Sequence, residues 1–333
     1  MQPFSASYVH RQGTVYKKTI GNYVVHTQEP HQVVTCEISP RLHKQLIYPT
    51  ADPNSLRHVV REVKEVKIID PVAVGDQVQF VDTGRGAGLI TEVLPRKSKL
   101  VRRSAVPMPG AHPFEQVIVA NVDQVVPVFS AAQPPPKWNL LDRYLISAES
   151  LDLASLICIT KLDLADQDGR LQAELELYRQ IGYRVLLTSI VTSEGIDALR
   201  DALQGRISVF VGKSGVGKTS LLNILQPGLG LRVNAVSQVT GKGRHTTSNL
   251  EMFPLEKGGS VVDTPGMREF GLWEVDETDL ALFFPEMRPY VGRCKFGLDC
   301  SHDDEPGCAI RKAVAQGAIA PRRYATFQRL RQE

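Results

Sequence analysis

The sequence predicts an α/β protein with a barrel before it and a small metal-binding module after it, and three patterns support this. In the middle of the chain, short apolar runs alternate with helical segments, which is typical of a parallel sheet covered by helices on both faces. Period-two runs rich in β-branched residues precede that region and predict an antiparallel barrel. Three cysteines and a histidine cluster near the C-terminus and predict a bound metal ion.

The bulk composition is that of a globular protein. The chain has 333 residues, enough for two or three domains, with 42% hydrophobic and 23% charged residues. The formal net charge of only +3 favours neither acidic nor basic partners. No apolar run is long enough to cross a bilayer and the first residues show no signal pattern, so we expect a cytoplasmic protein.

The predicted barrel occupies residues 1–106. Its strands are expected in the runs GTVYKK, NYVVHT, QVVTCEI, VGDQVQFV and GLITEVL. A basic stretch without an acidic residue closes it and contains Arg96, Lys97, Lys99, Arg102 and Arg103. Such a stretch either follows the phosphates of a nucleic acid or forms an ordinary solvated face. The run PMPGAHPFE then predicts a linker.

Residues 107–284 form the predicted α/β domain, and a phosphate-binding loop is its most specific motif. The loop follows the apolar run ISVFV, opens a helix and matches G-x-x-x-x-G-K-[ST]. Its predicted nucleotide-binding residues are Gly212, Lys213, Ser214, Gly215, Val216, Gly217, Lys218, Thr219 and Ser220. The backbone N–H groups of such a loop converge on phosphates, Lys218 would reach the β- and γ-phosphates, and Thr219 would coordinate Mg²⁺.

Base-reading segments precede this loop, although in ordinary GTPases they follow it. The buried run LICIT ends at Thr160 and is followed by Lys161 and, two residues later, Asp163. Asp163 would accept two hydrogen bonds from guanine, while the Lys161 stem would pack along the base. Thr160 stands where asparagine is usual, so we expect the loss of an amide that contacts the base or braces the phosphate loop. Thr188 and Ser189, after the next strand, resemble a loop whose backbone donates to the guanine oxygen. This order predicts a circularly permuted GTPase core.

Two switch-like segments follow the phosphate loop. In GKGRHTT, either Thr246 or Thr247 would contact Mg²⁺ and the γ-phosphate, and the spacing does not decide between them. In DTPG, Asp263 would hold Mg²⁺ through water and the Gly266 N–H would meet the γ-phosphate. These positions complete the expected set of nucleotide-binding residues.

The residue that orients the attacking water differs from the usual one. Ras-like enzymes place a glutamine shortly after the DTPG glycine, but this chain has Met267 there, which predicts slow intrinsic turnover. His245 is the candidate replacement, because imidazole can hydrogen-bond water near neutral pH. A contact of His245 and Arg244 with RNA phosphate is the alternative. With Lys218 and the two switch threonines, His245 completes the predicted catalytic set.

Residues 285–333 contain the predicted metal site. Cys294, Cys300, His302 and Cys308 supply three thiolates and one imidazole, a closed tetrahedral set that suits a structural Zn²⁺. Free buried cysteines or a disulfide are the alternatives. Cys36 and Cys158 lie alone in strand-like runs and are expected to be small core residues.

The last residues form a predicted basic helix. It carries Arg322, Arg323, Arg329 and Arg331, which would either contact RNA or line an ordinary solvated helix surface.

Together these motifs resemble the RsgA/YjeQ family of circularly permuted GTPases, the ribosome small-subunit-dependent GTPase A family. The resemblance covers nearly the whole chain and rests on VGDQVQF, PRKSKLVRRS, ANVDQVVPV, the GTPase motifs, GRHTT and the cysteine–histidine cluster. It implies an N-terminal OB-type RNA-binding barrel, a permuted P-loop GTPase domain and a C-terminal zinc-binding α-helical module. It further implies GTP or GDP, Mg²⁺ and one structural Zn²⁺ as cofactors.

The same resemblance implies a function. A family member would bind the small (30S) ribosomal subunit and its rRNA late in assembly, and the subunit would stimulate a GTP hydrolysis that is coupled to release. A monomer is expected. One alternative is a nucleotide-gated rRNA-binding switch in which hydrolysis is incidental. Another is an ATP-using phosphotransferase, against which Asp163 and the switch threonines argue.

Overall fold

The structure, a computed structural model, describes residues 9–28, 30–42, 72–103, 115–166, 168–227, 229, 250–263 and 278–332. The chain divides into two compact units. One consists of Met1–Val122, Thr247–Pro254 and Ser260–Pro265, and the other of Asp123–Thr246, Leu255–Gly259 and Gly266–Glu333. Among the described residues, no helix has the length and apolar character needed to span a membrane.

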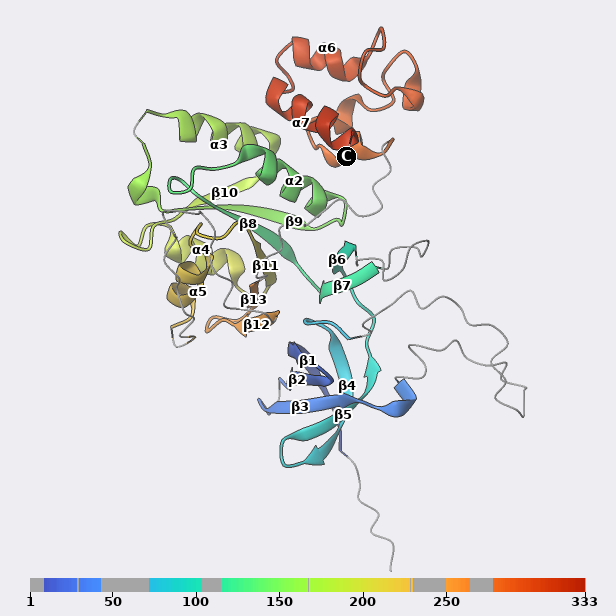
Figure 1. Cartoon of the computed structure of the whole chain (residues 1–333), viewed down its shortest axis with the longest axis vertical. Coiled ribbons are helices and arrows are strands. Elements are labelled where there is room, and N and C mark those ends of the chain that lie inside the picture. The colour runs from blue at the N-terminus through green and yellow to red at the C-terminus, as the bar shows by residue number, and fades with distance from the viewer. Residues whose placement is uncertain are drawn as a thin grey trace, which may run out of the picture. The chain divides into compact units, whose positions relative to one another are not determined.

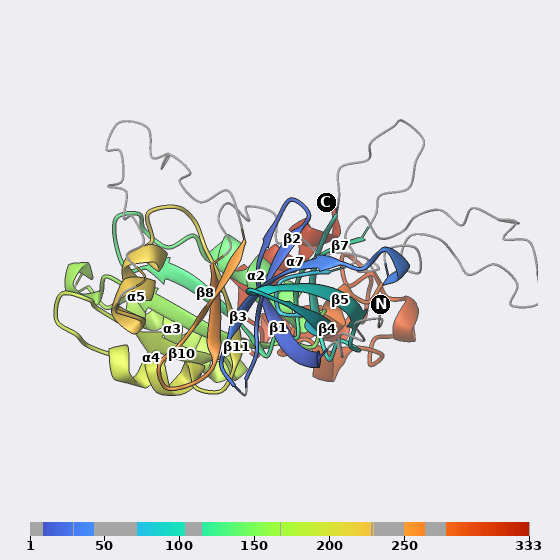
Figure 2. The same cartoon turned by 90° about the horizontal axis from the view of Figure 1, so that it is seen from below.

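The first unit contains the predicted five-stranded barrel. Its strands are β1 (Val9–Thr19), β2 (Asn22–His26), β3 (Val33–Ile38), β4 (Gln77–Gly84) and β5 (Ala87–Val93). They follow the order β1-β2-β3-β5-β4, and β4 pairs back onto β1, which closes the barrel (Figure 2). Alternate side chains such as Val15, Val25, Phe80 and Ile90 are fully buried, as the period-two pattern requires. Cys36 is buried among them, so its predicted role as a core residue is confirmed.

The basic stretch after the barrel is not one continuous surface. Arg96 donates from Nε and Nη2 to the two carboxylate oxygens of Asp76, both at 2.7 Å, and Asp76 is fully buried. Arg96 is therefore paired with a buried carboxylate of the barrel unit and does not belong to an ordinary solvated face. Lys97 and Lys99 are exposed. The strands β6 (Lys99–Arg103) and β7 (Glu115–Ala120) then form a separate two-stranded sheet.

A hairpin from far along the chain also belongs to the barrel unit. Its strands β12 (Glu251–Pro254) and β13 (Ser260–Asp263) pair antiparallel with each other. Strand β12 also pairs with β1, with Lys17 opposite Glu251. Nothing in the sequence patterns predicts this pairing.

The second unit contains a parallel sheet with helices on both faces. Its strands β8 (Gln124–Ser130), β9 (Ala154–Thr160), β10 (Arg184–Leu187) and β11 (Ile207–Val211) follow the order β10-β9-β8-β11. In Figure 1, α2 (Trp138–Glu149) and α3 (Arg170–Ile181) cover one face, and α4 (Ile196–Leu203) and α5 (Lys218–Leu225) cover the other. Every residue of β8 is buried, which explains the continuous apolar run. Cys158 in β9 is fully buried, as predicted.

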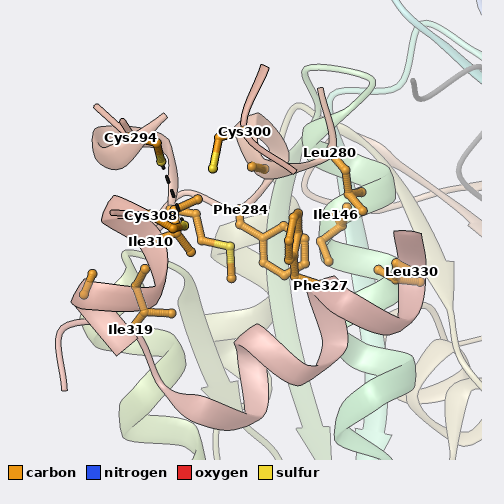
Figure 3. Close-up of a cluster of buried hydrophobic side chains, with 13 residues drawn as sticks. Ile146, Leu280, Phe284, Cys294, Cys300, Cys308, Ile310, Ile319, Phe327 and Leu330 are labelled. Carbon is orange, nitrogen blue, oxygen red and sulfur yellow. Dashed lines mark hydrogen bonds between the residues drawn. The ribbon is translucent and has the colours of Figure 1, made fainter. Parts of the chain in front are cut away.

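The C-terminal part of this unit packs on α2. It consists of the short 3₁₀ turns η2 (Leu280–Phe283), η3 (Arg288–Tyr290) and η4 (Gly297–Asp299) and the helices α6 (Ala309–Ala315) and α7 (Pro321–Arg331). The helix expected in DETDLALFF is a 3₁₀ turn in its described part. Ile146 of α2 joins Phe284 and Phe327 in one buried apolar cluster, and the two phenylalanine rings meet edge to face at 5.6 Å (Figure 3).

A buried ion-pair network fixes α7 beside this cluster. Arg323 is fully buried and contacts Asp142 of α2 at 2.9 Å and Glu286 at 2.6 Å. Arg322 contacts the other oxygen of Asp142 at 2.8 Å, and the Thr326 hydroxyl donates to the same oxygen at 2.9 Å. Arg323 is fully buried and so does not contact RNA, and Arg322 pairs with the same carboxylate, so neither forms part of an ordinary solvated helix surface.

The other two arginines of the tail also contact the protein itself. Arg331 donates to the Ser301 carbonyl at 2.6 Å, and Arg329 donates to the Thr326 hydroxyl at 3.3 Å. Arg329 is exposed, so of the four it is the one whose surroundings resemble an ordinary helix surface.

We predict that Arg323→Met lowers the free energy of unfolding by about 3–5 kcal/mol, because it leaves two buried carboxylates without this counter-ion. Arg329→Met on the same helix is the matched control and should change it by less than about 0.5 kcal/mol. Urea unfolding followed by tryptophan fluorescence measures both. Equal unfolding midpoints for the two variants would show that the network does not hold the module in place.

Candidate functional site

The carboxyl ends of three parallel strands bring the predicted nucleotide-binding segments together. Strand β9 ends at Thr160 and β11 at Val211, and both pair in parallel with β8 between them. The strands end at one edge of the sheet, where α/β proteins bind their ligands. The base-reading segment and the phosphate loop therefore lie on either side of the end of β8.

The phosphate loop connects β11 to α5 through glycines that other residues could not replace. A Cβ atom on Gly212 would lie 2.3 Å from the Val128 carbonyl oxygen, which no side chain tolerates. Gly217 has a φ of 95° and lies directly before α5. Lys218 Nζ donates to the Gly212 carbonyl at 2.6 Å and the Lys213 carbonyl at 3.0 Å, so the lysine lies over the loop.

The other predicted loop residues occupy two environments. Lys213 and Ser214 are exposed at the tip, Val216 is buried, and Thr219 and Ser220 are half-buried in the first turn of α5. A hydroxyl and backbone N–H groups at a helix N-terminus fit a phosphate and its Mg²⁺ ion. This donor set suits a magnesium nucleotide.

Thr160 braces the phosphate loop directly. Its hydroxyl donates to the Val216 carbonyl oxygen at 2.5 Å and also lies 3.3 Å from the Phe129 carbonyl oxygen. The expectation that replacing asparagine by Thr160 removes this brace is therefore wrong, since the hydroxyl reaches the loop in place of an amide. Thr160 is buried, which shields the hydrogen bond from water.

Lys161 makes a second connection between the two segments. The residue has a left-handed backbone with a φ of 55°, and its Nζ donates to the Gly215 carbonyl at 2.9 Å and to the Gln133 carbonyl. Burial lowers the pKa of Lys161, and the neighbouring Asp163 carboxylate opposes that shift. The Lys161 ammonium thus connects the base-reading segment, which carries it, to the loop after β8 and to the phosphate loop.

Asp163, the predicted base reader, is oriented by a hydroxyl. Ser189 Oγ donates to Asp163 Oδ1 at 2.5 Å, and Ser189 Oγ in turn accepts from the backbone N–H groups of Val191 and Thr192, both at 3.2 Å. Ser189 is almost fully buried, so its position is fixed. This role is not visible in the sequence, because a serine after a strand carries no signal for the carboxylate it contacts.

The backbone N–H groups of Thr188 and Ser189, which were expected to donate to the guanine oxygen, donate to carbonyl groups of the protein. The Thr188 N–H donates to the Ile159 carbonyl at 2.7 Å, and the Ser189 N–H donates to the Glu194 carbonyl at 3.0 Å. Both N–H groups therefore have backbone partners at the strand ends. These two residues contribute to the site by placing Asp163.

Of the predicted switch residues, the structure describes one. Asp263 ends β13 and lies opposite Glu251 in the β12–β13 hairpin. His245, Thr246, Thr247 and Gly266 lie outside the described residues, as do Arg244 and Met267.

The four predicted metal ligands converge in the C-terminal module. The ligand atoms of Cys294, Cys300, His302 and Cys308 all lie within 4.8 Å of one another, and all four residues are buried. Cys294 Sγ lies 3.9 Å from Cys308 Sγ (Figure 3). His302 Nδ1 lies 3.4 Å and 3.6 Å from these two sulfur atoms. Sulfur ligands about 2.3 Å from a tetrahedral zinc ion are roughly 3.8 Å apart, so the spacing fits Zn²⁺.

The surroundings of the cluster suit a metal ion. Burial raises the pKa of the Cys300 thiol to about 12 and lowers the pKa of His302, so both neutral forms are favoured and a bound cation would be needed to form the thiolate of Cys300. The Ala309 N–H donates to Cys294 Sγ at 3.2 Å and the Tyr324 hydroxyl to the His302 carbonyl at 2.7 Å. These contacts orient the ligands from outside.

Glu305 shapes the turn between two of the ligands. Its carboxylate accepts from the Ser301 hydroxyl and, at 2.8 Å and 2.9 Å, from the N–H groups of Ser301 and Asp303. Led by the Ser301 hydroxyl, these hydrogen bonds lower the pKa of Glu305 to about 2. No sequence pattern marks Glu305, because its partners are mainly backbone groups.

Comparison with known proteins identifies the family. The family profile described as RsgA GTPase matches residues 93–273, which is more than half of the chain. The chain belongs to the RsgA GTPase family. Its relatives include the small ribosomal subunit biogenesis GTPase RsgA of Gemmatimonas aurantiaca, 44% identical over 278 residues that cover 84% of this chain and 87% of the relative. The protein of the same name from Pseudomonas aeruginosa is 43% identical over 261 residues, or 78% of this chain and 75% of the relative.

Two solved structures share the fold of this chain. YjeQ from Thermotoga maritima has a TM-score of 0.73 and 30% identity, covering 97% of this chain and 98% of that one. YloQ, described as a circularly permuted GTPase, has a TM-score of 0.68 and 31% identity, covering 99% of this chain and 97% of that one. The predicted permuted GTPase fold is therefore confirmed, and the chain is a GTP hydrolase that acts on a guanine nucleotide.

We predict that Thr160→Val weakens GDP binding about tenfold, because a buried hydrogen bond to the phosphate loop is lost and the Val216 carbonyl is left unsatisfied. Thr160→Ser keeps the hydroxyl and should bind GDP within about twofold of the unmodified protein. Titration with a fluorescent GDP measures both affinities, and melting curves control for folding. Unchanged affinity in Thr160→Val would contradict the bracing role.

Proposed function

We propose that this GTPase binds the small ribosomal subunit late in its maturation, that the subunit stimulates GTP hydrolysis, and that hydrolysis releases the protein. The observation that carries this proposal is the joint brace of Thr160 and Lys161 on the phosphate loop, which suits a guanine-specific switch. Relatives that are 42–44% identical over most of the chain are named small ribosomal subunit biogenesis GTPases. The small ribosomal subunit enters the proposal as the partner because these relatives are named for it.

The nucleotide is proposed to bind through the residues of both segments. Asp163 reads guanine, and Lys161 lines the base beside the phosphate loop, residues 212–220. Lys218 contacts the β- and γ-phosphates. Thr219, Asp263 and one of the switch threonines would hold Mg²⁺, which would neutralise charge that develops on the phosphates. Gly266 donates its backbone N–H to the γ-phosphate.

The attacking water is proposed to be oriented by His245. A methionine at position 267 cannot hydrogen-bond that water, so another side chain must do so. His245 precedes the two switch threonines, one of which contacts the γ-phosphate in the proposed site. Intrinsic hydrolysis is then slow until the subunit fixes the segment that carries His245.

The remaining parts are assigned to assembly and recognition. Residues 1–106 are proposed as an RNA-binding barrel, residues 107–284 as the GTPase domain and residues 285–333 as a module folded around one structural Zn²⁺. Lys97 and Lys99, both exposed, are the described residues of the basic stretch that we assign to rRNA contact. We further propose that the protein is a monomer and acts in the cytoplasm, where ribosomal subunits are assembled.

A second candidate function follows from Met267. The missing glutamine favours a nucleotide-gated rRNA-binding switch in which hydrolysis is incidental. In that case GTP would set the affinity for the subunit, but the subunit would not accelerate turnover.

We expect purified small subunits to raise GTP turnover by about a hundredfold or more and to leave ATP turnover unchanged, since positioning of the catalytic water accounts for such factors. His245→Ala should lose most of the stimulation and keep its affinity for GTP. Turnover is measured with and without subunits, with ATP in parallel. Subunit binding that depends on GTP without acceleration would favour the switch, and no effect of subunits on binding or turnover would contradict both functions.

A further inference from the structure

His302 has an unusual backbone conformation for a residue that carries a side chain. Its φ is 59°, in the left-handed region, whereas the φ angles of Cys300 and Cys308 are −72° and −67°. A left-handed residue other than glycine costs free energy and persists only where the surrounding contacts hold it. In this conformation His302 Nδ1 lies within 3.6 Å of both Cys294 Sγ and Cys308 Sγ. The contacts that hold His302 therefore also determine whether its ring reaches the cysteines.

The Glu305 carboxylate holds the chain on both sides of His302. One of its oxygens accepts from the Ser301 N–H at 2.8 Å and from the Ser301 hydroxyl. The other oxygen accepts from the Asp303 N–H at 2.9 Å. Hydrogen bonds to a charged acceptor are stronger than those between neutral groups. A carboxylate that binds the residues before and after His302 fixes the direction of the backbone through His302 itself.

Helix α7 binds two carbonyl groups of the same turn. The Tyr324 hydroxyl donates to the His302 carbonyl at 2.7 Å, and Arg331 donates to the Ser301 carbonyl at 2.6 Å. Tyr324 and Arg331 are seven residues apart and therefore lie on one face of α7. Glu305 thus binds N–H groups of the turn and α7 binds its carbonyl groups, so the left-handed residue is held by several contacts at once.

We propose that Glu305 and Tyr324 are positioning residues of the metal site: together they hold His302 in the left-handed conformation that brings its ring to the cysteines. This inference rests on the proposed binding of one Zn²⁺ by the module. It adds two residues outside the cysteine–histidine pattern to those that determine the affinity for zinc.

A second explanation of any effect of Glu305 is its negative charge near a cation, and the chain offers a control for it. Asp304 is the neighbouring residue and has the same charge, but its side chain is 96% exposed and contacts Arg311 at 3.6 Å. An effect of charge alone would be lost as completely in Glu305→Gln as in Glu305→Ala. The glutamine carbonyl oxygen can still accept from Ser301, so positioning predicts a smaller loss for Glu305→Gln.

The test measures the zinc affinity of the full chain by competition with a chromophoric chelator. Glu305→Ala should weaken zinc binding about thirtyfold, as expected for residues that orient metal ligands. Glu305→Gln and Tyr324→Phe each lose one hydrogen bond to the turn and should weaken it only about three- to fivefold. Asp304→Ala is the matched control and should change the affinity by less than about twofold.

A second pair of variants shows whether Glu305 acts through His302. In His302→Ala the three cysteines still offer ligands, so a weaker zinc affinity can be measured. Adding Glu305→Ala to that variant should change the affinity by less than about twofold, because the ligand that Glu305 positions is absent. A contribution of Glu305 only to the folding of the module would give the same loss with and without His302. Circular dichroism at saturating zinc checks that each variant is folded.

Four results would each overturn the inference. These are an unshifted affinity in Glu305→Ala, equal losses in Glu305→Gln and Glu305→Ala, an equal loss in Asp304→Ala, and equal losses with and without His302. A failure of the proposed zinc site is distinguishable from these, because the unmodified chain would then not retain zinc against the chelator. The assay contains neither nucleotide nor ribosomal subunits, so a failure of the proposed GTPase cycle does not affect it.

Discussion

The hydrogen bond from the Thr160 hydroxyl to the Val216 carbonyl is the contact on which the nucleotide site depends. It joins the end of the base-reading strand to the phosphate loop, although these residues are 56 positions apart and occur in the reverse of the usual order. The order does not matter to the sheet, because β9 and β11 both pair in parallel with β8 and end at one edge. Lys161 adds a second bridge to the same loop. The permuted chain thus rebuilds one site from the spatial neighbours that an unpermuted chain would supply.

Helix α2 connects this site to the C-terminal module within the second unit. The helix leads from β8 to β9, and the loop before it supplies the Gln133 carbonyl that Lys161 contacts. On its other side, Asp142 receives Arg322 and Arg323 of α7, and Ile146 enters the apolar cluster of the module. The three cysteines of the predicted metal site belong to the same apolar cluster. The module is therefore fixed on an element that also borders the base-reading segment.

The sequence predicted those parts of the protein whose signal is local. A phosphate loop, a buried strand and a set of metal ligands are each encoded within a few neighbouring residues, so the fold class and the convergence of the cysteines with His302 could be derived. The errors concern charged residues whose partners are distant. Arg96 and Arg323 look solvated in sequence, but each pairs with a fully buried aspartate, Asp76 or Asp142, from another segment. Likewise, no pattern links Ser189 to Asp163 or β1 to β12, since those contacts exist only once the sheets have formed.

The central claim is that two segments in permuted order form one guanine-specific site, and the most direct test is the nucleotide preference of Asp163→Asn. An aspartate accepts hydrogen bonds from guanine N1–H and its amino group, whereas an asparagine offers one acceptor and one donor, which match xanthine. Dissociation constants are measured for GDP, ADP and xanthosine diphosphate with both proteins. We expect the unmodified chain to prefer GDP over both others by about a hundredfold or more, and Asp163→Asn to prefer xanthosine diphosphate over GDP. A chain that binds ADP as tightly as GDP, or a variant that keeps its preference for GDP, would contradict the account.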